Sequence, residues 1–200
     1  MPTTAVIYDL EFTAWTGSMS HRWLRPGEFK EIVQIGAVKV DAVSMKIVAE
    51  FDAIIRPRIN SALSPYFEKL TGISNDALKT GGVDLADALT RFVAFCGSDT
   101  TSAFGRDDLV IGENIRLYGL KDIAPAADFI DLRPWFRSNG LDSRGLHSCD
   151  VGPRLGVPFE GHTHNALADS RSLAAGARVL VGKGAPSPFY PALAGAKTAA

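Results

Sequence analysis

The stretch Ala5-Val6-Ile7-Tyr8-Asp9-Leu10-Glu11-Phe12 decides how this chain folds. It is rich in β-forming residues and apolar on both faces apart from two acids, which is typical of a central strand covered on both sides. Asp9 and Glu11 are two residues apart, so their side chains leave the same face with Cα atoms about 6.6 Å apart. Burying two carboxylates is costly unless a cation or hydrogen-bond donors offset the desolvation. The pair therefore predicts a shared cation or, with equal weight, ordinary acids at a strand end.

Two more strands are expected directly after this one. Residues 31–40 and 47–56 are β-rich, and the short turn around Val43-Ser44-Met45 joins them. The three strands should form an antiparallel meander. After these strands the sequence pattern becomes helical. Ser64-Pro65 can open a short helix through Leu70, and Asp84 can cap an amphipathic helix over residues 85–96.

The second half of the chain alternates strands with helices. Strands are expected at Thr101 to Gly105 and at Asp128 to Leu132, and helices from about Asp107, Leu146 and Asn165. Strands that alternate with helices usually lie parallel. The pattern predicts an α/β fold in which helices flank a mixed sheet.

Composition excludes several classes of protein. The 200 residues, 46% of them hydrophobic, suffice for one domain without disulfide or metal staples. The 22 acidic and 21 basic residues nearly balance, unlike those of a protein that coats long nucleic acid. Cys96 and Cys149 have no CxxC spacing, which argues against a zinc ribbon and suits a reducing compartment. Without a signal-peptide pattern or an apolar run of membrane-spanning length, the expected location is cytoplasmic.

The end of the chain differs from the rest. Beyond about Val181 the sequence is rich in Gly, Pro and Ala and has no periodicity. We therefore expect a domain over residues 1–180 and a flexible tail over residues 181–200, although Phe189 and Tyr190 could dock on the body.

Two later segments also carry acids at chemically useful places. In Phe104-Gly105-Arg106-Asp107-Asp108 a strand gives way to a helix, where an aspartate is usually an N-cap. His164 and Asp169 flank the start of the last helix. On a regular helix they would lie about 140° apart, so they meet only if His164 belongs to the preceding loop at Gly161-His162-Thr163. His147 has no partner in the sequence and is read as structural.

Taken in order, these segments resemble the DEDDh 3′-to-5′ exonucleases of the ribonuclease H-like fold. Asp9-x-Glu11, a later Asp, and His164 followed by Asp169 have that family's order and approximate spacing, and Leu70-Thr71-Gly72-Ile73 looks like the segment after its third strand. Phe104-Gly105-x-x-Asp108 is similar to the Trp-Gly-x-x-Asp motif of the Eri-type and KapD-like subgroup, with Phe in place of Trp. The match selects Asp108 over Asp107, which is then a cap or a hydrogen-bond acceptor beside the site. The resemblance covers roughly residues 6–180.

The resemblance implies both a fold and a mechanism. The fold is ribonuclease H-like: a five-stranded sheet with an antiparallel meander of strands one to three, then parallel strands four and five. Asp9, Glu11, Asp108 and Asp169 would hold two divalent cations about 4 Å apart. All-oxygen ligands favour Mg²⁺ or Mn²⁺. His164 would be the general base, with His162 as an alternative imidazole, and the product a nucleoside 5′-monophosphate.

The same resemblance implies a substrate and partners. The substrate would be the single-stranded 3′ end of RNA or DNA, with RNA favoured through the subgroup. Phe12, Thr13 and Leu70 would pack against the terminal nucleoside, although Phe12 and Leu70 suit ordinary core packing equally well. A homodimer is common in the wider family, and no membrane partner is expected.

Two other classes of function compete with this interpretation. Asp9-x-Glu11-x-Thr13 after an apolar strand also looks like the aspartyl-phosphate phosphatases, in which Asp9 would be the nucleophile. That family prefers Asp at the second acidic position and has no use for His164 and Asp169. The other competitor is a catalytically inactive nucleic-acid-binding module on the same fold. Retention of all five active-site residue types argues against this module.

Overall fold

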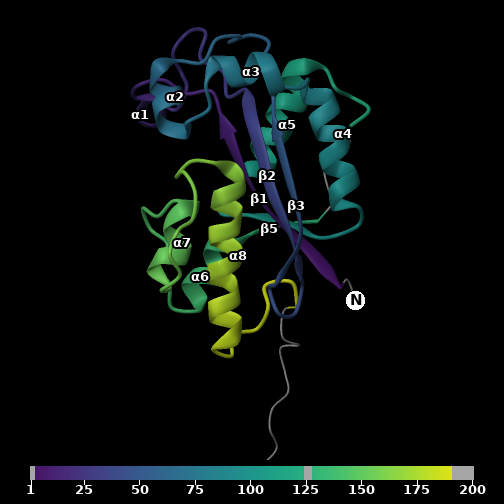
Figure 1. Ribbon diagram of the computed structural model, residues 1–200, viewed down its shortest axis with the longest axis vertical. Helices are drawn as coiled ribbons and strands as arrows, with labels where there is room; N and C mark the ends of the chain where they lie inside the picture. Colours follow the sequence, from purple (N-terminus) through teal and green to yellow (C-terminus); the bar gives the residue numbers. More distant parts are fainter. Residues whose placement is uncertain (1–2, 124–127, 191–200) are drawn as a thin grey trace, which may run out of the picture.

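A mixed five-stranded sheet organises the protein, seen in a computed structural model that describes residues 3–123 and 128–190 (Figure 1). Its order is β3-β2-β1-β4-β5, with β1 at the centre. The strands are β1 (Thr4–Phe12), β2 (Ile32–Asp41), β3 (Ile47–Ile54), β4 (Thr101–Ala103) and β5 (Phe129–Asp131). The first three pair antiparallel, whereas β4 runs parallel to β1 and β5 parallel to β4. The predicted fold is confirmed, although β4 and β5 are shorter than expected.

Helices cover both faces of this sheet. They are α1 (Ser18–His21), α2 (Pro65–Thr71), α3 (Asn75–Gly81), α4 (Leu85–Cys96), α5 (Asp107–Tyr118), α6 (Leu132–Ser138), α7 (Ser148–Arg154) and α8 (Ala166–Gly182). Side chains of α4 and α5 pack with Tyr8 and Leu10 on one face. Side chains of α6, α7 and α8 pack with Ile7 and Val38 on the other. Figure 1 shows α8 running along one side of the long strands, with α7 beside it, and α4 and α5 on the other side.

The alternation of β1 sets where its acids point. Tyr8 and Leu10 enter the core on the α4 and α5 side, so Asp9 and Glu11 share the opposite face with Ile7. Asp9 and Glu11 are buried there, at 9% and 7% exposure. The side chains of Asp9 and Glu11 thus point toward the helical layer that contains α7 and α8.

Three short helices were not predicted. α1, α3 and α6 have at most seven residues, too few for an apolar periodicity to show in the sequence. Local caps begin two of them: Ser74 Oγ accepts from the Ala77 amide in α3, and Asp131 accepts from the Arg133 amide in α6. Asp131 is also the last residue of β5, so the chain passes from strand to helix without a loop.

The chain beyond α8 is attached to the body up to residue 190. Phe189 is buried in the core between α8 and the sheet, and Ser187 Oγ donates to the Ala42 carbonyl. Trp135 Nε1 donates to the Pro186 carbonyl at 2.9 Å. The expectation of a flexible tail from residue 181 is therefore wrong for residues 181–190, because an aromatic anchor docks there. The rest of that predicted tail, residues 191–200, lies outside the described residues.

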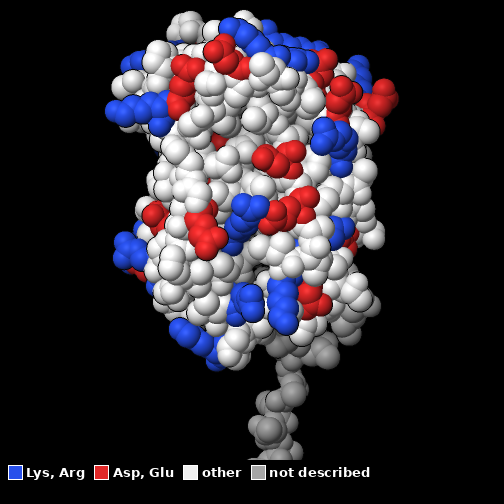
Figure 2. Space-filling model, in the orientation of Figure 1, with Lys and Arg blue, Asp and Glu red and all other residues white. Residues whose placement is uncertain are grey.

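The surface carries no continuous field of one sign on the face shown in Figure 2, where Lys and Arg side chains are interspersed with Asp and Glu. This mixture agrees with the near-zero net charge of the sequence. Over residues 3–123 and 128–190, the structure has no helix with both the length and the apolar character needed to cross a membrane.

Candidate active site

A glycine in β2 allows the last helix to reach the acids of β1. Gly36 lies opposite Asp9 in the strand register, and a Cβ on it would lie 2.0 Å from the Leu167 amide nitrogen. Gln34 Oε1 accepts from the Ala166 amide at 3.0 Å, and Ser170 Oγ donates to the Gly36 carbonyl at 2.8 Å. The start of α8 therefore rests directly on the sheet beside Asp9, where no larger residue than glycine fits.

This contact brings the predicted acids of β1 and α8 together. Ligand atoms of Glu11, His164 and Asp169 all lie within 4.8 Å of one another. Ser148 Oγ, at the start of α7, donates to Asp9 Oδ1 at 2.7 Å. Asp169 is 2% exposed, and among the described residues its buried Oδ1 accepts no hydrogen bond. A buried carboxylate oxygen without a donor is the kind of group that a cation satisfies.

Burial and mutual repulsion raise the pKa values of these carboxyl groups. Burial raises the pKa of Asp9 to about 7, against the hydrogen bond from Ser148. Burial and then the Asp9 charge raise the pKa of Asp169 to about 9. The pKa of Glu11 is well above its ordinary value because of burial and the charges of Asp9, Asp169 and Asp107. The protein's own side chains thus leave the negative charge of this site largely uncompensated.

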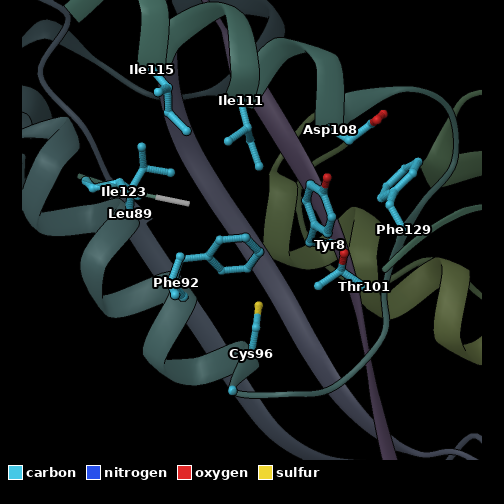
Figure 3. Close-up of a pocket in the computed structure, with 12 residues that line it drawn as sticks. Tyr8, Leu89, Phe92, Cys96, Thr101, Asp108, Ile111, Ile115, Ile123 and Phe129 are labelled. Atoms are coloured by element: carbon cyan, nitrogen blue, oxygen red, sulfur yellow. The ribbon is translucent and has the colours of Figure 1, made fainter. Parts of the chain in front are cut away.

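The third acidic segment contributes Asp107, and not Asp108. The pKa of Asp107 is strongly raised by burial and by the charge of Asp9, while Arg133 and the Leu10 amide oppose the rise. Asp108 instead forms an ion pair with Arg106 at 2.6 Å, which lowers the pKa of Asp108. In Figure 3 Asp108 stands at the start of α5, at the edge of an apolar cavity near Tyr8 and Phe129, and its carboxylate points away from the other lining side chains. The expectation that Asp108 joins the other acids is wrong.

The helical register of α5 explains this outcome. Its buried residues are Val110, Ile111 and Asn114. At 100° per residue, Asp107 lies about 15° from the centre of that buried face and Asp108 about 115° away. The apolar pair Val110-Ile111 is visible in the sequence and could have indicated Asp107. Asp107 is also not the expected cap, since Arg106 holds the N-cap position.

His164 occupies the loop position that the spacing predicted. It has φ of 58°, a left-handed conformation that few side chains adopt, and Asn165 follows it as the N-cap of α8. The turn directs the half-buried imidazole toward Glu11 and Asp169. Burial, and then the nearby His147, lower the pKa of His164. Its ring is therefore neutral near pH 7 and can accept a proton.

The other two histidines of this region have different positions. The ring of exposed His162 packs beside Gly72, where a Cβ would lie 3.4 Å from His162 Cδ2, and His162 does not belong to the group of Glu11, His164 and Asp169. His147, read as structural from the sequence, lies with its ring centroid 5.3 Å from that of His164. Neither His147 nor Ser148 was predicted here, because they are far from the acids in the sequence and match no motif.

The predicted substrate-binding residues lie at the end of β1 and of α2. Phe12 is half-buried, and its ring centroid lies 5.4 Å from that of Trp23. Leu70 is half-buried near the end of α2. The Thr13 hydroxyl donates to the Phe29 carbonyl and accepts from the Glu31 amide, so its hydrogen bonds serve the loop. Phe12 and Leu70 therefore present apolar surface, whereas the Thr13 hydroxyl is already engaged in hydrogen bonds with the loop.

Comparison with known proteins places this geometry in a family. The RNase_T family, described as exonuclease, matches residues 6–175. The chain is 24% identical over 192 residues to the 3′-5′ exonuclease Snipper of Drosophila melanogaster, covering 85% of this chain and 66% of the relative. It is 26% identical over 190 residues to 3′-5′ exoribonuclease 1 of Mus musculus, covering 84% of this chain and 50% of the relative. This chain thus spans between half and two thirds of the length of these relatives.

Solved structures show the same fold. The nuclease domain of 3′hExo, a DEDDh family member bound to rAMP, superposes with a TM-score of 0.78 at 22% identity, covering 94% of this chain and 96% of that one. The cell-death related nuclease 4 superposes with a TM-score of 0.73 at 19% identity, covering 92% of this chain and 65% of that one. With the ribonuclease H-like fold, the acids of β1 and α8 and His164 in place, this chain belongs to the RNase_T exonuclease family.

Proposed function

We propose that the protein is a metal-dependent 3′-to-5′ exonuclease that shortens single-stranded nucleic-acid 3′ ends, prefers RNA to DNA and releases nucleoside 5′-monophosphates. The observation that carries the proposal is the gathering of carboxylates from β1, α5 and α8: Glu11 and Asp169 lie together beside His164, and Asp107 interacts with the Asp9 charge. Among the described residues, the buried Asp169 Oδ1 has no hydrogen-bond partner. The family supports the reaction class.

The donor set fits two divalent cations. Asp9, Glu11, Asp107 and Asp169 offer only carboxylate oxygens, which favour Mg²⁺ or Mn²⁺ over softer ions. Asp107 takes the place that the sequence motif assigned to Asp108. When bound, such a pair of ions stabilises the charge on the attacking and leaving oxygens of a phosphodiester. Without cations, the negative charge of these carboxylates would repel the phosphate of a substrate.

The remaining residues have separate tasks. His164 is neutral near pH 7 and next to Glu11, so we assign it as the base that takes the proton of the attacking water. Ser148 holds Asp9 through its hydrogen bond and thereby fixes the orientation of that carboxylate. The apolar surfaces of Phe12 and Leu70 suit the terminal base. The side chain of Thr13 contributes indirectly, by tying the end of β1 to Glu31.

The RNA preference rests on the relatives. Curated relatives include exoribonucleases, and similar solved structures were determined with rAMP and with a histone mRNA stem-loop. Family membership argues against the aspartyl-phosphate phosphatase, which would also need Asp9 as a free nucleophile, whereas Asp9 is buried and hydrogen-bonded to Ser148. The cytoplasmic location and the homodimer stay predictions.

A direct assay tests the proposal. The purified chain is incubated with matched 5′-labelled RNA and DNA oligonucleotides, with Mn²⁺ or Mg²⁺ and then with chelator. Stepwise shortening from the 3′ end that needs the cation, and runs faster on RNA, is expected. Failure to cleave either strand would support the inactive binding module, and faster cleavage of DNA would contradict the sugar preference.

A further inference from the structure

An arginine that the mechanism does not use lies at the edge of the acid cluster. Arg133, in the first turn of α6, lies beside Gly105 in the turn between β4 and α5. A Cβ on Gly105 would lie 3.7 Å from Arg133 Cζ. Gly105 is two residues before Asp107, and the Arg133 charge acts on the Asp107 carboxyl group. The guanidinium is thus a positive group at the border of a strongly negative site.

Local hydrogen bonds hold this side chain without using all of its donors. Asp131 accepts from Arg133 Nη2 at 2.7 Å and from Nε at 3.1 Å. The Arg133 side chain remains 40% exposed, and among the described residues its Nη1 donates no hydrogen bond. Asp131 therefore fixes the guanidinium in one orientation and leaves donors on its open side, which suits a phosphate oxygen.

The position of Arg133 indicates which phosphate it would meet. Arg133 lies over Gly105, just before α5 and Asp107, whereas Asp169 belongs to α8 and His164 to the loop before α8. Arg133 thus borders the cluster on the Asp107 side, away from Asp169 and His164, where the reacting phosphate must meet the base. A nucleic-acid strand that is cleaved at its last phosphodiester has a second phosphodiester on the 5′ side of the cleaved one. This second group lies outside the reacting centre and is free to meet Arg133.

We propose that Arg133 binds the phosphodiester next to the cleaved one and thereby makes the enzyme select a polynucleotide over a single nucleotide ester. This inference rests on the proposed exonuclease function. Arg133 would act as a specificity residue, because it contacts a part of the substrate that undergoes no chemistry. Energy from such a remote contact improves the reaction of the longer substrate alone.

The chain contains a matched control. Arg144 is held by Asp142 through the same Asp-x-Arg arrangement, with Nη2 at 2.7 Å and Nε at 2.9 Å. Its side chain is 85% exposed, and the Arg144 charge acts on none of the buried acids named above. Arg133→Gln and Arg144→Gln therefore remove the same charge and the same local ion pair, but only Arg133→Gln removes a cation beside the site.

The test compares two substrates in the presence of Mn²⁺. One is a single-stranded oligonucleotide, and the other is the p-nitrophenyl ester of a nucleoside 5′-monophosphate, which has a cleavable phosphate and no neighbour. For Arg133→Gln we expect the ratio of kcat/KM on the oligonucleotide to kcat/KM on the ester to fall about ten- to a hundredfold, mainly through KM. The salt dependence of the oligonucleotide reaction should lose about 0.7 from its log–log slope. Arg144→Gln should leave both quantities unchanged.

Other outcomes overturn the inference. An unchanged ratio, whether both activities fall together or neither does, would mean that Arg133 binds no neighbouring phosphate. If the wild type cleaves neither substrate, the exonuclease proposal itself fails. Thermal melting of both variants checks folding. Should Arg133→Gln unfold, Arg133→Lys replaces it, because lysine keeps the charge but lacks the planar guanidinium group. The ratio of Arg133→Lys should then fall below that of the wild type, and a wild-type ratio would contradict a guanidinium contact.

Discussion

Two groups of carboxylates in this protein have opposite surroundings. Near the surface, Glu50, Asp108 and Asp142 each form an ion pair with an arginine, and the pKa of each is lowered. In the interior, the inward acid cluster, which consists of Asp9, Glu11, Asp107 and Asp169, has raised pKa values because burial and repulsion dominate. A chain that supplies arginines freely elsewhere leaves these acids without full compensation. The difference indicates a site made for an external cation.

The largest expected effect is on turnover, which substitutions in the inward acid cluster should lower and substitutions of the surface carboxylates should not. Asp9→Asn and Asp169→Asn should each lower turnover by about 10³-fold or more, because each removes a ligand that positions the charge needed at the phosphate. Asp142→Asn, which removes an acid of the surface group, should keep wild-type turnover. Single-turnover assays with Mn²⁺ measure all three. Turnover near the wild-type level for either cluster variant would contradict the two-cation assignment.

The second prediction divides two neighbours in the sequence. Asp107→Asn should lower turnover by about 10²-fold or more, since its carboxylate faces Asp9, whereas Asp108→Asn should change turnover by less than about threefold. Asp108 loses only an exposed pair with Arg106, which contributes little to stability. The same assay with both variants checks the helical register of α5. Inactivation by Asp108→Asn with active Asp107→Asn would restore the motif-based choice.

The third prediction concerns the imidazole beside the cluster. His164→Ala should slow cleavage by about 10²-fold, at the lower end of what loss of a general base costs. Metal-induced stabilisation should be nearly intact, because the carboxylates remain. His162→Ala is the control, since the His162 ring packs on Gly72 and not on the acids. Rates for both variants across about pH 6 to 9 decide the assignment: a wild-type pH profile in His164→Ala would exclude it as the base.

The smallest expected effect is on the pH dependence of stability, which has opposite signs for the inward acid cluster and for the surface carboxylates. In chelator, the raised pKa values of Asp9, about 7, and Asp169, about 9, mean that the folded state holds protons that the unfolded state releases near pH 4. The stability of the metal-free protein should therefore fall as pH rises from about 4 to 9. Asp142, with a pKa of about 2, contributes in the other direction, and its small contribution is lost as pH falls from about 4 to 2.

Divalent cations should stabilise the folded protein to an extent that depends on pH. Saturating Mg²⁺ or Mn²⁺ binds the ionised cluster in the folded state only, so it should raise the melting temperature most at the alkaline end. Melting curves at several pH values, with cation and with chelator, measure the effect. Equal cation shifts at about pH 5 and pH 9 would show that the bound ion does not depend on ionisation of the cluster.

Local patterns were sufficient for most of the scaffold. The apolar run of β1 with acids two residues apart predicted both a central strand and the shared face of Asp9 and Glu11, because strand alternation is a property of the backbone alone. The caps Ser64 and Asn165 lie at the starts of α2 and α8, as their side-chain chemistry indicates. The loop position of His164 followed from helical spacing.

The arrangement of the site depended on contacts between distant segments. The motif indicated Asp108, but in the structure Asp107 accepts a hydrogen bond from the Leu10 amide of β1 and interacts with the Asp9 charge, whereas Asp108 pairs with Arg106. Ser148 binds Asp9 across 139 residues of sequence.

By itself, the sequence determined the strands and the principal helices, because these follow from periodicity and short spacing, and its ordered motifs indicated the family. It also predicted Glu11, Asp169 and His164 as site residues, which the structure brings close together. Only the tertiary structure decided which of two adjacent aspartates points inward, that Gly36 admits α8 to the sheet, and that Arg133 lies over Gly105. The physical reason is that side-chain direction at a helix start and close approach between elements are set by the packing of whole elements, and no local propensity encodes that packing.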